Sequence, residues 1–206
     1  MHIELLDHTK LSNIVEAGRV CYQSYHLGGN YQKPTDNITQ KDTNYLERVV
    51  NQNGHASITR HVQYVFKVEG ISTKTLLAAT RHGPGTNFSV MSSRFCKIDK
   101  FGESFTETPN KQVNSLLVKH IQEIVVLHKE CKPSAEDLAM LYPQAMQYNM
   151  IVSFNPQSLK HFFDMREPGT HAHFDIQELS SLLYDCIPKE HKFLFKSKLR
   201  DNITKL

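Results

Sequence analysis

The chain has 206 residues, of which 39% are hydrophobic and 22% are charged, and its formal net charge is +3. This composition is typical of a soluble globular protein, and no run of about 20 apolar residues is present that would span a membrane. Lysines and arginines do not gather in blocks, which argues against nucleic acid as the main partner. The charge remains compatible with small anions held by a few arginines.

The first ten residues, MHIELLDHTK, lack the basic start and the apolar run of a signal peptide, so we expect a cytoplasmic protein without a membrane segment. The four cysteines stand far apart and form no CxxC pair, which predicts free thiols rather than a zinc ribbon. The histidine pairs His171/His173 and His55/His61 have no acidic or cysteine partner at ligand spacing. We therefore expect no metal site.

Hydrophobic periodicity predicts many helices and few strands. In the first part of the chain we expect a strand at 3–7 and helices over 10–25 and 43–52, which flank a loop from 26 to about 40. A strand over 62–68 follows, then a helix over 73–82 capped by Ser72 and a loop over 81–95. In the second part we expect the longest helix over 111–131, a capped helix starting at 133–137, and helices over 157–166 and 171–186. Strands and helices do not alternate regularly. The predicted class is α+β, with a small mixed or antiparallel sheet, flanking helices and a helical lobe, in a single domain spanning 1–206.

The segment RHGPGTNFSVMSSRF, residues 81–95, has an unusual composition for a surface loop. It places Arg81 and Arg94 on either side of a Gly-Pro-Gly hinge, together with His82 and three serines. Arginine forks suit phosphate and carboxylate oxygens, and a glycine-rich backbone allows N–H groups to approach an anion closely. The segment therefore predicts an anion site.

Two further polar clusters stand at GHASITRH, residues 54–61, and at FNPQSLKHFFDMR, residues 154–166. Each cluster by itself also fits a helix cap, a turn or a solvated helix end. Several common sites are absent from the sequence, including the GxxxxGK[ST] phosphate loop, the GxGxxG fingerprint, the GxSxG elbow and HExxH. A Rossmann dinucleotide site is therefore not indicated.

Taken in order, HASITRHVQYVFKVEGIS, RHG, SSRF and NPQSLKHFFDMR resemble the flavin-dependent thymidylate synthases. That family carries His-x-Ser/Thr-x-x-Glu-His, a strand ending in Glu-Gly-Ile-Ser, Arg-His-Arg followed by Ser-x-Arg-Tyr, and Asn-Ala-Arg-Ser-Leu-x-x-Phe-Leu-x-x-Arg. The similarity extends to the PKEHKFLF tail and so covers nearly the whole chain. Coincidence is a poor explanation for the ordered combination.

The resemblance implies a homotetramer with FAD bound between subunits. It implies that C5 of dUMP, or of a related pyrimidine nucleotide, is methylated with methylenetetrahydrofolate as the carbon donor and NADPH as the reductant. In this family the reduced flavin supplies the hydride and no cysteine attacks the uracil. The folate and the nucleotide are therefore the expected small-molecule partners.

The same resemblance implies roles for particular residues. The nucleotide is expected to contact Arg81, Ser92, Ser93, Arg94 and Arg166. The FAD is expected to contact His55, Ser57, Arg60, Arg81, His82, Gly83, Asn155 and His161. The candidate catalytic residues are Arg166, Ser92 and His55. Arg166 would reach the pyrimidine carbonyls and stabilise charge that develops when hydride arrives at C6. Ser92 is interpreted as a binding residue, since no base stands next to it in the sequence.

Several positions depart from the family pattern. Gly83 replaces the second arginine of Arg-His-Arg, and Arg60 replaces a glutamate, so Arg60 is a candidate to supply the cation that Gly83 lost. The other departures are Leu77 or Ala78, Phe95, Ala139, Gln157, His161 and one extra residue after Arg166. Because these positions face ligands, two alternatives stay open beside dTMP synthesis. One is an altered substrate or product, such as hydroxymethylation of a pyrimidine nucleotide. The other is a non-catalytic homologue that binds flavin or nucleotide.

Overall fold

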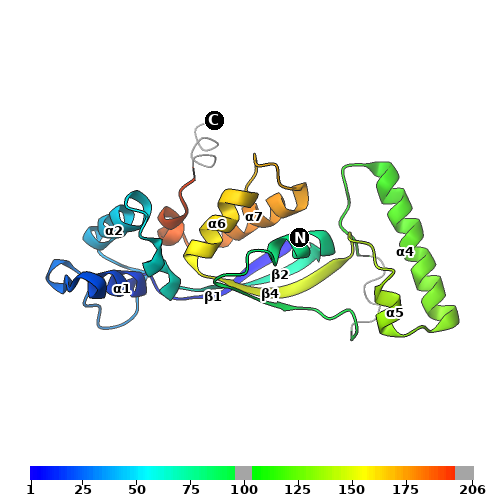
Figure 1. The fold of residues 1–206 in the computed structure, drawn as a ribbon, viewed down its shortest axis with the longest axis horizontal. Coiled ribbons are helices and arrows are strands. Elements are labelled where there is room, and N and C mark those ends of the chain that lie inside the picture. The colour runs from blue at the N-terminus through cyan, green and yellow to red at the C-terminus, as the bar shows by residue number, and fades with distance from the viewer. Residues whose placement is uncertain (96–103, 198–206) are drawn as a thin grey trace.

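The computed structural model describes residues 1–95 and 104–197, and its centre is a four-stranded sheet (Figure 1). The strands follow the order β1-β2-β4-β3, and every neighbouring pair is antiparallel. Their bounds are His2–His8 for β1, Tyr64–Ser72 for β2, Thr86–Val90 for β3 and Gln147–Phe154 for β4. The expected α+β class is confirmed, and the sheet is antiparallel rather than mixed.

The α-helices are α1 (Ser12–Tyr22), α2 (Gln40–Leu46), α3 (Thr73–Ala79), α4 (Lys111–Cys131), α5 (Ala135–Ala139), α6 (Pro156–Arg166) and α7 (Phe174–Cys186). Helix α2 continues as a π-helix, Glu47–Gln52, and short 3-10 helices span Tyr25–Leu27, Ala56–His61 and Lys189–Phe195. In Figure 1, α6 and α7 lie over one face of the sheet, α1 and α2 lie beyond one end, and α4 and α5 lie beyond the other. No helix in the two described ranges is long and apolar enough to cross a membrane.

The core forms where β2 and β4 face α6 and α7. Strand β2 alternates from Tyr64 to Val68, so Tyr64, Phe66 and Val68 are fully buried while the residues between them are half-buried. Phe162 and Phe163 of α6 are also fully buried. Burial of each such aromatic side chain contributes about 1.5–3 kcal/mol, which fixes the position of α6 on the sheet.

Helix α4 has the bounds that the sequence predicts, and Ser72 caps α3 by accepting a hydrogen bond from the amide of Thr75. The predicted extension of α3 to His82 is wrong, because the helix ends at Ala79. Thr80 and Arg81 form a turn in which the amide of His82 donates to the carbonyl of Ala79 at 3.0 Å, so the chain leaves the helix before it reaches the Gly-Pro pair.

The prediction of one loop over 81–95 is wrong in its middle part. Thr86–Val90 forms β3, which pairs along β4 from Thr86 opposite Phe154 to Val90 opposite Met150. The prediction also omitted β4, although Met150, Val152 and Phe154 alternate in the manner of a half-buried strand. Strand β3 has only five residues, of which three are polar, and Ile151 interrupts the polar face of β4, so neither segment shows a clean alternation of polar and apolar residues.

Candidate functional site

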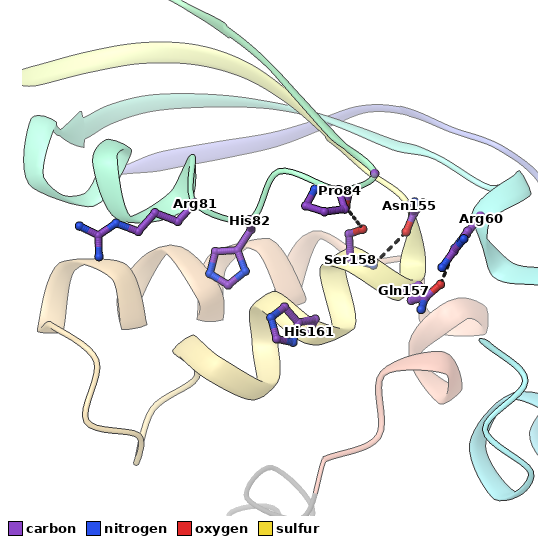
Figure 2. A pocket seen from close by; sticks show the side chains of 9 residues that line it. Arg60, Arg81, His82, Pro84, Asn155, Gln157, Ser158 and His161 are labelled. Carbon is purple, nitrogen blue, oxygen red and sulfur yellow. Dashed lines mark hydrogen bonds between the residues drawn. The ribbon is translucent and has the colours of Figure 1, made fainter. Parts of the chain in front are cut away.

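A pocket of about 420 Å³ lies between the 3-10 helix Ala56–His61, the turn after α3 and the first turns of α6 (Figure 2). Its lining joins all three polar clusters of the sequence, except the Ser-Ser-Arg part of the second. The lining residues are Arg60, Arg81, His82, Pro84, Gly85, Asn155, Gln157, Ser158 and His161.

The turn after α3 is clamped onto the start of α6. The side-chain oxygen of Asn155 caps α6 by accepting a hydrogen bond from the backbone amide of Ser158 at 2.8 Å. The backbone amide of Asn155 donates to the carbonyl of Gly85 at 3.1 Å. The Ser158 hydroxyl donates to the carbonyl of Pro84 (Figure 2). These bonds fix one wall of the pocket and leave the N-terminus of an 11-residue helix beside it, where anions are favoured.

Gly85 is required by this clamp. Its φ is +74°, and a Cβ at this position would lie 2.1 Å from Asn155 Nδ2 and 2.5 Å from Ser158 Oγ. No other residue fits both the dihedral and the space. In contrast, a Cβ at Gly83 would meet nothing within 4 Å, so the backbone there does not demand glycine.

Arg60 reaches the pocket from the opposite wall. Its Nε donates to Oε1 of Gln157 at 2.7 Å, although the two residues are 97 positions apart in the chain. Within the described ranges, no hydrogen bond engages the two terminal nitrogens of this guanidinium. Arg60 is therefore oriented by α6 while its remaining donors stay available.

His82 is buried and accepts a hydrogen bond from Arg166 Nε at its Nε2 atom, at 3.2 Å. Its ring centroid lies 5.0 Å from that of Phe162 and 5.4 Å from that of His161. Burial, together with the charge of Arg166 and the neighbouring His161, lowers the pKa of His82 to about 4. The ring is thus neutral at physiological pH, carries its proton on Nδ1 and holds Arg166 in place.

Among the described residues that line the pocket, two are arginines and none is a carboxylate. Arg166 adds a third cation behind His82. An excess of fixed donors without an internal anion is the arrangement expected for binding phosphate or other oxyanions.

The Ser92–Arg94 part of the predicted site lies elsewhere. It follows the far end of β3, and the five residues of that strand separate it from the pocket by roughly 16 Å. Arg94 pairs with Glu136 at 2.6 Å, both side chains being more than half exposed, and Ser93 hydrogen-bonds the hydroxyl of Tyr148. A single chain does not bring this group and the pocket together.

The remaining predicted residues lie near the pocket without lining it. His55 and Ser57 are exposed at the start of the 3-10 helix Ala56–His61, and Gly83 directly precedes Pro84. Sequence reasoning did not place Gly85 or Ser158 in the site. The Asn-Pro-x-Ser cap of α6 and the Gly-Pro-Gly segment were the available signals, but their contact depends on the folded chain.

Comparison with known proteins gives full-length matches. Residues 4–191 match the family described as thymidylate synthase complementing protein (Thy1). The flavin-dependent thymidylate synthase of Campylobacter jejuni (strain RM1221) is 30% identical over 217 residues, covering 98% of this chain and 100% of that protein. The corresponding protein of Wolinella succinogenes is 29% identical over 207 residues, covering 95% and 97%.

Solved structures agree with the sequence matches. The flavin-dependent thymidylate synthase ThyX from Helicobacter pylori, complexed with FAD and dUMP, superposes with a TM-score of 0.84 at 25% identity, covering 95% of this chain and 98% of that one. The UMP/dUMP methylase PolB from Streptomyces cacaoi shares the fold, with a TM-score of 0.68 at 17% identity over 89% of this chain and 88% of that one. The ordered motifs, the family match and the full-length relatives establish that this chain belongs to the flavin-dependent thymidylate synthase family.

Proposed function

We propose that this protein methylates C5 of dUMP to form dTMP, with methylenetetrahydrofolate as the carbon donor, NADPH as the reductant and FAD as the cofactor. The observation that carries the proposal is the cationic pocket at the start of α6, next to the Arg166–His82 pair. A relative with the same fold has been solved with FAD and dUMP, and a family member is 30% identical along its full length.

The pocket residues fit a dinucleotide cofactor. Arg60, Arg81 and the N-terminus of α6 offer positive charge to a pyrophosphate, and the side chain of Asn155 offers an amide beside them. No lining carboxylate would repel it. Bound FAD would supply the hydride for the pyrimidine ring, and the chain's own part is to bind and orient the reactants.

Arg166 is the residue we assign to the pyrimidine. Its guanidinium is oriented by a neutral His82, so the remaining N–H groups can point at the two ring carbonyls. Negative charge that develops on these oxygens as hydride arrives would be stabilised by a donor that is already in position. A neutral His82 accepts the Arg166 hydrogen bond without adding a second cation beside it.

The nucleotide phosphate is assigned to Ser92, Ser93 and Arg94 of a neighbouring subunit. These residues are too far along β3 to meet the pocket of their own chain, so an active site that uses both groups must form between copies. Apolar side chains that are more than half exposed lie near this end of the molecule and support a homotetramer: Phe95, Leu116 and Met140. Burial of such side chains between subunits would remove them from water.

The direct test is a product assay with purified protein, FAD, NADPH, methylenetetrahydrofolate and dUMP, read by mass. A dTMP product supports the proposal. A hydroxymethylated nucleotide would support altered chemistry instead. This second candidate is favoured by the pocket itself, where Arg60 and Gln157 meet at positions that both depart from the family pattern.

Absence of turnover with flavin bound would contradict the proposal and favour a non-catalytic homologue, provided other pyrimidine nucleotides also fail. Arg166→Lys is the matched control. It should bind flavin while the product is strongly reduced, which separates true turnover from contaminating activity.

A further inference from the structure

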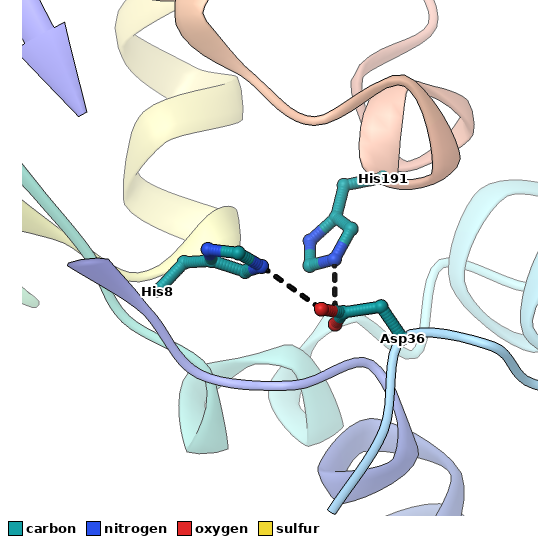
Figure 3. Close-up of side chains that lie close together, drawn as sticks. All are labelled: His8, Asp36 and His191. Atoms are coloured by element: carbon teal, nitrogen blue, oxygen red, sulfur yellow. Dashed lines mark hydrogen bonds and ion pairs between the residues drawn. The ribbon is translucent and has the colours of Figure 1, made fainter. Parts of the chain in front are cut away.

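A second cluster of chemically active side chains lies away from the pocket, where three distant parts of the chain meet (Figure 3). His8 ends β1, Asp36 belongs to the segment before α2, and His191 lies in the 3-10 helix Lys189–Phe195. The ligand atoms of these three residues all lie within 4.8 Å of one another. Within residues 1–95 and 104–197 this is the only such group of three.

The spacing of the donor atoms suits one ion. His8 Nε2 lies 3.0 Å from Asp36 Oδ2, and His191 Nε2 lies 3.0 Å from Asp36 Oδ1. Ligand atoms bound about 2.1 Å from a tetrahedral zinc ion are separated by about 3.4 Å, so these separations need to widen by only a few tenths of an ångström. Two imidazole nitrogens with a carboxylate are a donor set for zinc and similar divalent transition metals.

The ligands are held by their surroundings. The hydroxyl of the fully buried Tyr64 lies 2.8 Å from Nδ1 of His191, so it orients the imidazole from behind. The amide of Leu11 donates to Asp36 Oδ1 at 2.9 Å and fixes the carboxylate. Outer hydrogen bonds of this kind accompany metal-binding histidines and raise their affinity.

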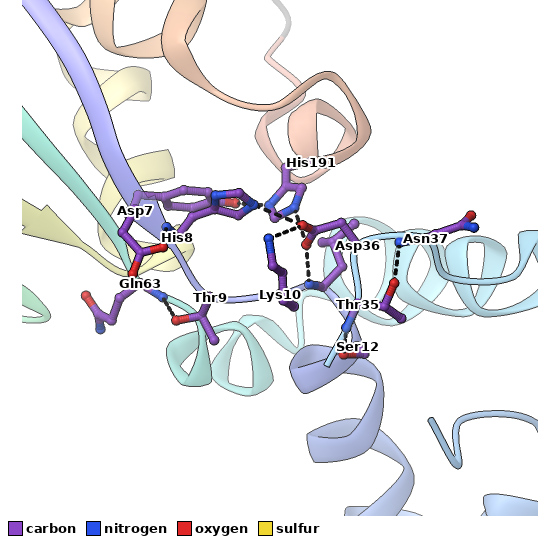
Figure 4. Close-up of polar contacts among 12 residues, drawn as sticks. Asp7, His8, Thr9, Lys10, Ser12, Thr35, Asp36, Asn37, Gln63 and His191 are labelled. Atoms are coloured by element: carbon purple, nitrogen blue, oxygen red, sulfur yellow. Dashed lines mark hydrogen bonds and ion pairs between the residues drawn. The ribbon is translucent and has the colours of Figure 1, made fainter. Parts of the chain in front are cut away.

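One cation of the chain competes for the same carboxylate. Lys10 Nζ lies 2.9 Å from Asp36 Oδ2 (Figure 4). Its side chain is 42% exposed, so it can turn into solvent at little cost. His191, in contrast, is 0% exposed and cannot leave.

We propose that His8, Asp36 and His191 form a binding site for a divalent transition-metal ion, Zn²⁺ foremost, with Lys10 displaced and water completing the coordination. The ion would join the end of β1 to the segment before α2 and to the 3-10 helix Lys189–Phe195. None of the three ligands lines the pocket described above, so the role is to stabilise the fold. The proposal does not depend on the reaction.

The test uses the full chain without a histidine tag, treated with chelator and then titrated with Zn²⁺ by calorimetry at pH 7.5. We expect one ion per chain and a melting temperature that rises with Zn²⁺ concentration. Co²⁺ should give the visible absorption of a nitrogen- and oxygen-ligated ion.

Three variants make the test specific. His8→Gln, at a partly exposed ligand, should lower affinity at least tenfold without unfolding the chain, and Lys10→Met should raise affinity several-fold because the competing cation is removed. His171→Ala, at an exposed histidine outside the cluster, is the matched control and should change nothing. Absence of binding in both the parent and Lys10→Met would overturn the proposal. So would unchanged binding in His8→Gln, or a loss of binding in His171→Ala.

Discussion

The two ends of β3 are built differently. At the Thr86 end, the preceding turn is bonded to α6 through Pro84, Gly85, Asn155 and Ser158, and the pocket beside it is formed within one chain. At the Val90 end, the side chain of Arg94 is exposed and forms a surface ion pair with Glu136. The part of the family's motif beside the pocket, residues 81–85, is thus held in place by hydrogen bonds to α6. The Ser92–Arg94 part lies at the surface.

The largest effect should come from breaking the preorganised end. Gly85→Ala places a Cβ against Asn155 and Ser158 at a positive φ, so we expect a loss of about 2–4 kcal/mol of unfolding free energy and loss of flavin binding. Chemical denaturation and flavin absorbance measure both. Gly83→Ala is the matched control, because space is free there; an equal loss in this control would show that the clamp is not the cause.

Arg166→Lys should come next. A lysine lacks the Nε donor that binds His82 and the planar fork for two carbonyls, so we expect kcat to fall on the order of 100-fold. Flavin occupancy and melting temperature should stay near those of the parent. A fall in occupancy parallel to that in kcat would place Arg166 at the cofactor rather than at the pyrimidine.

Arg94→Ala probes the exposed end. Stability should hardly change, since exposed ion pairs contribute little, whereas the KM for dUMP should rise at least tenfold through loss of a phosphate contact. Mixing this variant with Arg166→Ala under conditions of subunit exchange should restore part of the activity, because some sites then receive both intact halves. No recovery in mixed oligomers would argue that each chain forms a complete site alone.

Arg60→Glu should have a smaller effect, on the order of tenfold weaker FAD binding, because a cation in the pocket is replaced by an anion. The double variant Arg60→Glu/Gly83→Arg restores the charges of the family pattern. We expect it to regain most of the affinity, measured by flavin fluorescence. Unchanged binding in the single variant would refute the idea that Arg60 replaces the missing arginine.

The last prediction concerns the pH dependence of stability. The pKa of His82 falls from 6.5 in the unfolded chain to about 4 in the folded protein, so between these values the unfolded state binds more protons. The stability that this residue contributes is complete above pH 6.5 and is lost as the pH falls toward 4. Other histidines titrate in the same range. The measurement is therefore the free energy of unfolding as a function of pH in the parent and in His82→Gln, and the contribution of His82 is the difference between the two curves. Identical pH slopes in the two proteins would mean that folding does not lower the pKa of His82.

The predicted elements succeeded where the signal was local. Helix α4 shows a long apolar period with a capping asparagine, and Ser72 and Asn155 stand directly before the helices that they cap. The prediction missed β3 and β4 because β3 has five residues, three of them polar, and Ile151 interrupts the polar face of β4, so neither shows a clear two-residue period.

The sequence by itself determined the family and the α+β class, and five of the nine residues that line the pocket were among its predicted ligand contacts, because motifs and helix caps are encoded by neighbours in the chain. Only the tertiary structure decided which of these residues meet. It joined Arg60 to Gln157, brought His8, Asp36 and His191 together, and separated Arg94 from the pocket. Each of these outcomes depends on how segments far apart in the chain pack against one another, and such packing leaves no periodic trace in the sequence.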